Sequence, residues 1–127
     1  MKDLMIATLA VVLLISSWFL FLHYADGQSQ AFRKQINEQV LEDIETGNWA
    51  HAEKQLKALS RDWHRFRKVS LFFLDTHAIN DIDYSIARAL MYTHARDDSN
   101  STGELKAMVE QLSFLTDNES LSLQNIF

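Results

Sequence analysis

Five basic side chains recur at helical spacing in the middle of the chain, and they are its clearest candidate for binding chemistry. They are Lys54, Lys57, Arg61, Arg65 and Lys68. Steps of three and four residues place them along one helix face, as a basic stripe. Such a stripe is either a solvated face, a dock for an acidic protein surface, or a contact for anionic lipid headgroups or envelope polymers. As a solvated face, it would be partly neutralised by Glu38, Glu42 and Glu45 of the preceding helix.

Catalytic and metal-binding chemistry has few candidate residues. The chain contains no cysteine, no serine in a nucleophile elbow and no glycine-rich phosphate loop. The nearest approach to a metal cluster is the group Asp75, His77, Asp81 and Asp83. Acidic residues at the start of a helix are equally well explained by the helix dipole. The sequence therefore predicts a protein that is not an enzyme, with no metal site and no cofactor.

The distribution of charge indicates the class of partner. The formal net charge is −5, yet residues 48–74 hold six basic and only two acidic side chains. A net acidic chain with one basic helix argues against nucleic acid as the main partner.

A long apolar segment near the N-terminus predicts attachment to a membrane. The nineteen residues 4–22 carry no charge, and all but Thr8, Ser16 and Ser17 are apolar. As a helix they would extend for about 29 Å, close to the hydrocarbon thickness of a bilayer. We expect a transmembrane anchor over residues 1–25 and a soluble domain over residues 26–127.

Two alternatives to an uncleaved anchor are a cleaved signal peptide and a buried helix of a soluble protein. His23 stands where signal cleavage requires a small residue, which favours the anchor. Trp18 and Tyr24 would mark the membrane interface, where half-wet aromatic rings are preferred. The flanking charges give the positive-inside rule little to act on. A single N-terminal anchor most often leaves the following domain outside the cytoplasm, so we expect a single-pass cell-membrane protein with an extracytoplasmic domain.

Four amphipathic helices are expected after the anchor, so the fold class is all-α with a small four-helix bundle. The expected ranges are 28–46, 48–74, 78–95 and 102–116, and the first of them has no clear break from the anchor except Gly27. Gly47 suits a left-handed helix end, and Asn48 suits an N-cap. Ser101 and Glu104 would form a capping box, and Asn118 would end the last helix.

Apolar residues at helical spacing give the expected core. These are Phe32, Ile36, Val40 and Ile44; Trp49, Ala52, Leu56, Leu59, Trp63, Phe66, Ser70 and Phe73; Ile79, Ile82, Ile86, Ala89 and Leu90; and Leu105, Met108, Val109, Leu112 and Leu115. Tryptophans on such a seam indicate core packing more than a ligand platform. Ile126 and Phe127 are unusually apolar for a chain end, and we expect them to dock on the bundle or on a partner.

Two resemblances follow from short motifs. The stretch from Glu45 to Ala52 is similar to the helix–turn–helix junction of a tetratricopeptide repeat, with glycine before an aromatic residue and alanine after it. Only one such unit occurs, so it indicates a tight helical hairpin and no repeat array.

The whole chain resembles a family of small uncharacterised proteins from spore-forming Firmicutes. The resemblance is carried by the short anchor, the Gly-x-Trp-x-x-Ala of residues 47–52, Trp63, the Asp75-x-His77 turn and the ending at residues 121–127. It implies a membrane-anchored helical domain of unknown activity, and it raises the expectation of a membrane-protein partner.

These observations together predict a non-enzymatic accessory or adaptor subunit of a membrane protein complex. The alternative is a tethered domain that binds small ligands or envelope polymers through the basic stripe or an interhelical pocket. A third possibility is a purely structural anchor that associates with itself.

Overall fold

The computed structural model describes the backbone of residues 1–126 and the side chains of residues 1–117. Its elements are α1 (Lys2–Gln35), the π-helix η1 (Ile36–Val40), α2 (Leu41–Glu45), α3 (Trp49–Ser70), α4 (Thr76–His94) and α5 (Asp98–Ile126). No strand occurs over residues 1–126, so the predicted all-α class is confirmed.

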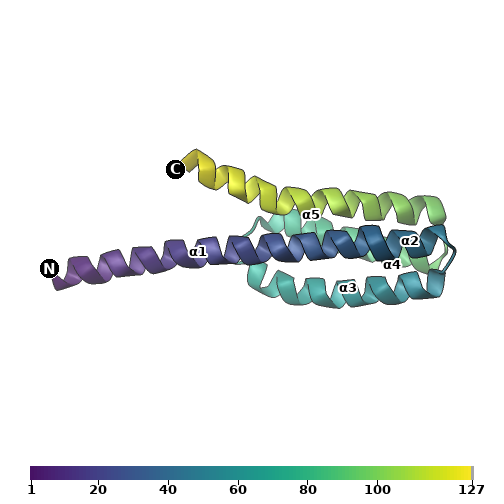
Figure 1. Ribbon diagram of the computed structural model, residues 1–127, viewed down its shortest axis with the longest axis horizontal. Helices are drawn as coiled ribbons and strands as arrows, with labels where there is room; N and C mark the ends of the chain where they lie inside the picture. The colour runs from purple at the N-terminus through teal and green to yellow at the C-terminus, as the bar shows by residue number, and fades with distance from the viewer. Residues whose placement is uncertain (127) are drawn as a thin grey trace.

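The first three elements form one continuous helical rod over Lys2–Glu45. Figure 1 shows the rod projecting well beyond the bundle at its N-terminal end. Gly27 lies inside the rod and does not interrupt it. The expected anchor and the first bundle helix are therefore one element, and the bundle is completed by α3, α4 and α5.

The π-helix explains how the rod keeps one face buried. Ile36, Val40 and Ile44 follow one another every four residues, and all three are buried. Four residues of α-helix overshoot a full turn by about 40°, so such a stripe would drift off its face. The wider π turn removes part of this rotation. The local helix type is thus matched to the strict four-residue spacing.

The hairpin between α2 and α3 is formed by residues close together in the sequence. Gly47 has φ +78°, the left-handed conformation expected of it. Asn48 is the residue before α3, but its side chain makes no capping hydrogen bond. His51 Nδ1 lies 2.5 Å from Asp43 Oδ2 and joins the two sides of this hairpin instead.

The α3–α4 connection differs from the expected one. Helix α3 ends at Ser70, before the expected Leu74, because the amides of Phe72 and Phe73 bond to carbonyls three residues back instead of four. The Asp75 carboxylate accepts the backbone amide of His77 at 2.9 Å, which makes Asp75 the N-cap of α4.

The expected bounds of the last helix were wrong at both ends. Helix α5 begins at Asp98, because Arg96 takes φ +57° and Asp97 then accepts the Asn100 amide. Ser101 is consequently a buried residue within the helix, and its hydroxyl donates to the Asp97 carbonyl. No glycine or proline follows Thr116, so nothing terminates the helix at Asn118 and the backbone continues to Ile126.

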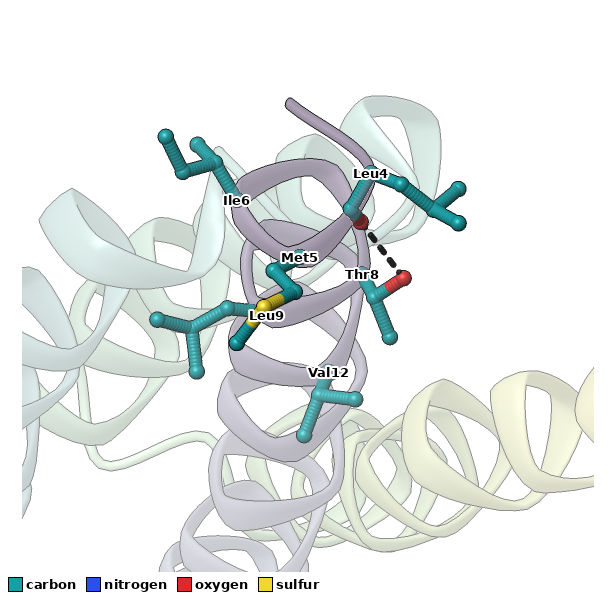
Figure 2. A pocket seen from close by; sticks show the side chains of 6 residues that line it. All are labelled: Leu4, Met5, Ile6, Thr8, Leu9 and Val12. Atoms are coloured by element: carbon teal, nitrogen blue, oxygen red, sulfur yellow. Dashed lines mark hydrogen bonds between the residues drawn. The ribbon is translucent and has the colours of Figure 1, made fainter. Parts of the chain in front are cut away.

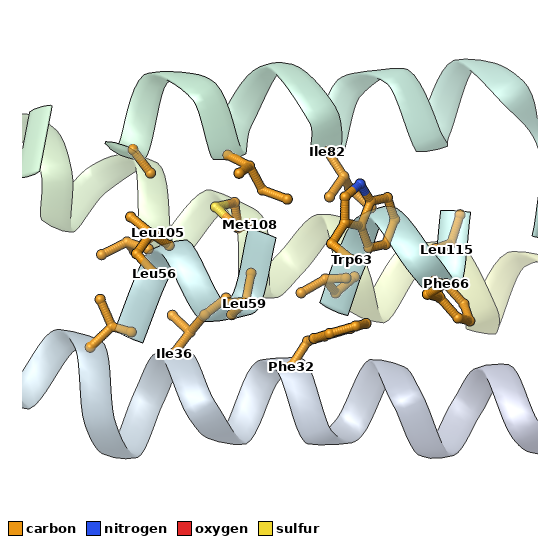
Figure 3. Packing of buried hydrophobic residues seen from close by; sticks show 14 of the residues in the cluster. Phe32, Ile36, Leu56, Leu59, Trp63, Phe66, Ile82, Leu105, Met108 and Leu115 are labelled. Carbon is orange, nitrogen blue, oxygen red and sulfur yellow. The ribbon is translucent and has the colours of Figure 1, made fainter. Parts of the chain in front are cut away.

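The rod and the helices α3, α4 and α5 pack as an up-and-down bundle. Adjacent pairs in space are the α1–α2 rod with α3, α3 with α4, α4 with α5, and α5 with the rod. Figure 3 shows the side chains of these helices converging on one apolar interior, with Trp63 near its middle. Phe32 packs edge-on against Trp63, with ring centroids 6.0 Å apart.

Most of the expected core residues are buried. Trp63 is 1% exposed. Of the expected core residues, the partly buried ones at the edge of the cluster are Trp49, Phe73, Leu90 and Val109. Each large apolar side chain that is fully buried stabilises the fold by about 1.5–3 kcal/mol.

The packed core also reaches into the segment expected to be pure anchor. Phe21 and Ala25 are buried within the cluster, and Trp18 is partly covered. The bundle therefore begins about one helical turn before the expected domain boundary at residue 25.

Candidate functional site

The N-terminal half of the rod is an exposed apolar surface. Over residues 4–20 no side chain is buried; for example, Leu4, Leu14 and Leu20 are each more than 70% exposed. This is the one helix among residues 1–126 that is long and apolar enough to cross a membrane. The Thr8 hydroxyl donates to the Leu4 carbonyl at 2.8 Å, so its polar group is satisfied within the helix.

A shallow apolar hollow lies on this same helix. Figure 2 shows it lined by Leu4, Met5, Ile6, Thr8, Leu9 and Val12. All six residues lie between Leu4 and Val12 of α1, and no other described element contributes to the lining. The hollow is therefore a feature of the exposed apolar surface and does not have the enclosure of a ligand cavity.

The basic stripe lies on the outer face of α3. All five of its residues are exposed. Lys57 Nζ lies 3.2 Å from Glu53 Oε1, and an Arg65 guanidinium nitrogen lies 3.8 Å from Asp62 Oδ1. Both partners belong to α3 itself.

The expected neutralisation of the stripe across the hairpin is absent from the described side chains. Glu38, Glu42 and Glu45 are exposed on the rod and make no ion pair there with α3. Among the described side chains, the acidic residue of the rod that pairs with α3 is Asp43, through His51. The stripe therefore keeps most of its positive charge available to solvent or to a partner.

The α3–α4 turn presents apolar residues beside the projecting half of the rod. Phe72 is 85% exposed, and Leu71 is also exposed. Phe73 points the other way and stacks on Phe21 with ring centroids 4.3 Å apart, while its distance to the Trp18 ring is 5.6 Å. The aromatic stack holds the turn against α1.

Sequence reasoning missed this turn, because residues 71–74 were assigned to a helix. A signal was nevertheless present: Leu71, Phe72, Phe73 and Leu74 are four consecutive apolar residues. A helix with one buried face cannot bury four successive side chains. Such a run indicates either a turn or a second apolar contact.

A small groove lies between α1 and α3 at the edge of the basic stripe. Its volume is about 220 Å³, and it is lined by Tyr24, Gln28, Ala31, Phe32, Gln35, Asp62, Arg65 and Phe66. The groove combines an aromatic floor with polar rims, and Arg65 is shared between the groove and the stripe.

The acidic residues considered for a metal site have other roles. Asp83 accepts hydrogen bonds from Trp63 Nε1 and from Arg67 Nε, each at 2.6 Å. Asp75 is occupied as the N-cap of α4. Over the described residues no group of three metal-ligating side chains is present. The Asp83 carboxylate instead joins α3 to α4 in a polar contact at the edge of the core.

Two further ionic contacts join neighbouring helices. Glu53 of α3 lies 3.1 Å from His94 of α4 and also contacts Lys57. The hydrogen bond from His94, followed by that from Lys57, lowers the pKa of the Glu53 carboxyl. Between α4 and α5, Glu104 lies 2.8 Å from Arg88, and its hydrogen bond raises the pKa of that guanidinium.

The expected docking residues Ile126 and Phe127 lie outside the residues whose side chains are described. The backbone of α5 does run to Ile126. In Figure 1 its C-terminal end extends past the α3–α4 turn, in the direction of the N-terminus of the rod.

Comparison with known proteins gives one match. No curated protein and no solved structure matches the chain. A family model described as a domain of unknown function, DUF4363, matches residues 19–126. The match thus covers most of the chain and begins next to Trp18, where the packed part of the rod begins. The chain belongs to the DUF4363 family.

Proposed function

We propose that this protein is a non-enzymatic, membrane-anchored accessory subunit of a membrane protein complex. The apolar N-terminal half of the rod crosses the bilayer, and the bundle is presented at the membrane surface. The observation that carries this proposal is the continuity of the rod: the helix with the exposed apolar half also supplies six of the twenty buried residues of the described core cluster.

This continuity favours the anchor over its two alternatives. Cleavage as a signal peptide near residue 25 would remove Phe21 and cut the rod beside Ala25, both of which are buried in the core. A buried helix of a soluble protein would need a covering surface, and no side chain over residues 4–20 is buried by the described residues. An exposed apolar surface of this size is typical of membrane or protein contact.

A role in recognition fits the surface of the bundle. The stripe is exposed and largely free of cross-helix pairing, which suits docking to an acidic surface of a partner. A rigid rod would hold that surface at a fixed height and orientation above the bilayer. We propose an extracytoplasmic position for the bundle, as is common for single N-terminal anchors.

The test is a pull-down of the tagged full-length protein from its native membrane in gentle detergent, after brief crosslinking. The proposal predicts one dominant membrane protein in near-equal amount. A monomer without a companion would overturn the subunit role.

Charge reversals on separate faces identify the surface that binds. The triple variant Lys57→Glu, Arg61→Glu and Arg65→Glu should abolish the crosslink. The control variant Lys34→Glu with Lys106→Glu reverses exposed lysines on other faces and should preserve it. Equal loss in both variants would show that the stripe has no specific role.

The alternative function is binding of a small ligand or an anionic envelope polymer. It is favoured by the 220 Å³ groove, which shares Arg65 with the stripe. Full-length protein in nanodiscs would then bind soluble polyphosphate, and added salt would weaken the binding steeply. A third alternative, self-association through the anchor, predicts a stable oligomer by light scattering of the same preparation.

A further inference from the structure

We propose that the α3–α4 turn is a lipid-contacting element, with Leu71 and Phe72 inserted at the headgroup boundary of the bilayer. This inference rests on the proposed anchoring role of α1. It adds a second membrane contact to the bundle, about fifty residues further along the chain.

The depth of the turn follows from the length of the rod. A hydrocarbon core about 30 Å thick takes up about twenty helical residues, so a span that begins at Leu4 reaches the opposite boundary near His23. Trp18 and Phe21 then lie about 7 Å and 3 Å inside that boundary. Phe73 stacks on the Phe21 ring and lies tilted against the Trp18 ring. The turn is therefore held in the outermost few ångströms of the hydrocarbon, next to the headgroups.

The side chains at that level are suited to the interface. Phe72 is 85% exposed and Leu71 is 37% exposed, although both are large and apolar. Phe73, between the turn and α1, fixes the backbone, so the two exposed residues point away from the bundle without needing to reorganise. An aromatic residue on a preformed turn loses little conformational entropy when it enters the boundary region.

Only the C-terminal end of the basic stripe lies close enough to the turn to contact lipid headgroups. Lys68 lies three residues before Leu71, and Arg65 is one turn further from the membrane. Both are exposed and within reach of lipid phosphates, to which basic side chains are attracted. Lys57 and Lys54 are about 16 Å and 21 Å from Lys68 along the helix, beyond a Debye length of about 8–10 Å. The stripe therefore divides into a lipid-facing end and an end left for other partners.

Acidic charge at the turn does not oppose this arrangement directly. Asp75 is exposed, but its carboxylate accepts the His77 amide and is held at the start of α4. Asp75 comes after the apolar residues of the turn and caps α4, which belongs to the bundle.

The absence of native cysteine allows a direct depth measurement. Single-cysteine variants Phe72→Cys, Tyr84→Cys and Leu13→Cys of the full chain would carry an environment-sensitive fluorophore. Each would be reconstituted in vesicles of phosphatidylcholine with phosphatidylglycerol. Tyr84 is the matched control, because it is an aromatic residue 62% exposed on α4, about 12 Å further along the bundle than Thr76.

The expected result is that the label at position 72 is quenched by lipids with a shallow spin label and is several-fold less accessible to aqueous iodide than the label at position 84. Equal iodide quenching at positions 72 and 84 would overturn the proposal. Protection from iodide without quenching by the spin-labelled lipids would also overturn it, because the turn would then be covered by protein.

The label at position 13 distinguishes failure of this inference from failure of the anchoring proposal. Deep quenching at position 13 with aqueous exposure at position 72 leaves the anchor intact and removes only the lipid-contacting turn. Aqueous exposure at position 13 removes the anchor itself and overturns both proposals. Thermal unfolding equal to that of the parent chain establishes that each labelled protein is folded.

Discussion

The two halves of the N-terminal rod are both helical and both carry apolar side chains, yet these side chains meet different surroundings. Residues 4–20 are apolar on every side, and none of their side chains is buried. Residues 21–45 are apolar along one stripe, and that stripe is fully packed in the bundle. The distribution of apolar residues around the helix axis, more than their number, therefore distinguishes a membrane-type segment from a bundle helix.

The largest effect should come from placing charge in the all-round apolar half. The double substitution Leu9→Arg and Leu13→Arg should disfavour insertion by about 5–7 kcal/mol, because each arginine near a bilayer centre costs about 2.5–3.5 kcal/mol. Alkaline carbonate extraction should then release the protein from membranes. Retention in the membrane pellet, with unchanged thermal unfolding, would show that these residues are not the anchor.

The corresponding test of the bundle core is the substitution Trp63→Ala. Trp63 is 1% exposed, so truncation should lower the free energy of unfolding by about 3–5 kcal/mol. Thermal unfolding by circular dichroism measures the change, while carbonate extraction should be unaffected. Trp49→Ala is the matched control, because Trp49 lies at the edge of the core and should cost less. An unchanged melting temperature for Trp63→Ala would refute its central place in the core.

A smaller effect is expected at the polar contact between α3 and α4. Asp83→Ala leaves Trp63 Nε1 and Arg67 without their shared acceptor. The expected loss of stability is about 1–2 kcal/mol, at the low end for such groups because water reaches this site. Asp81→Ala, an exposed neighbour on α4, should be nearly neutral. Equal melting temperatures for the two variants would show that the contact contributes nothing measurable.

The smallest effect concerns pH. Glu53 has a pKa below its usual 4.5 in the folded protein, through His94 and then Lys57. The folded state therefore binds fewer protons there, so this stabilisation is present above pH 4.5 and is lost as the pH falls through the folded-state pKa. The difference in melting temperature between the parent and Glu53→Gln should be visible at pH 7 and shrink towards pH 3. A difference that does not change with pH would contradict this assignment.

Much of the fold was predictable because periodic apolar residues decide it. The core positions of α3 and α4 follow from the three- and four-residue spacing of their apolar residues. Gly47 indicated the position of the first hairpin. The start of α5 was not predictable in this way. Ser101 and Glu104 matched a capping box, yet Asp97 and the left-handed Arg96 set the boundary one turn earlier. Several residues can satisfy a cap locally, and tertiary packing selects among them.

The candidate surfaces were predictable only in part. Spacing was sufficient to place the basic stripe on one exposed face of α3. The partners of Asp83 and the His94 partner of Glu53 come from another helix, at separations of 16 to 41 residues, and no local pattern encodes such pairs. The contact of Phe73 with Trp18 and Phe21 also depends on the relative position of two helices. That contact is what brings the α3–α4 turn to the level of the expected membrane surface.

We propose that one unbroken helix passes from lipid into the bundle core, and a scan of single spin-labelled cysteines from residue 8 to residue 36 in nanodiscs tests this continuity. High oxygen accessibility is expected on every side up to residue 20, followed by a helical alternation in which positions 25, 29, 32 and 36 are immobilised. The spin-label mobility should show no break at Gly27. Water accessibility over residues 8–16, or a mobile segment around Gly27, would show that the helix does not pass from lipid into the bundle in this way.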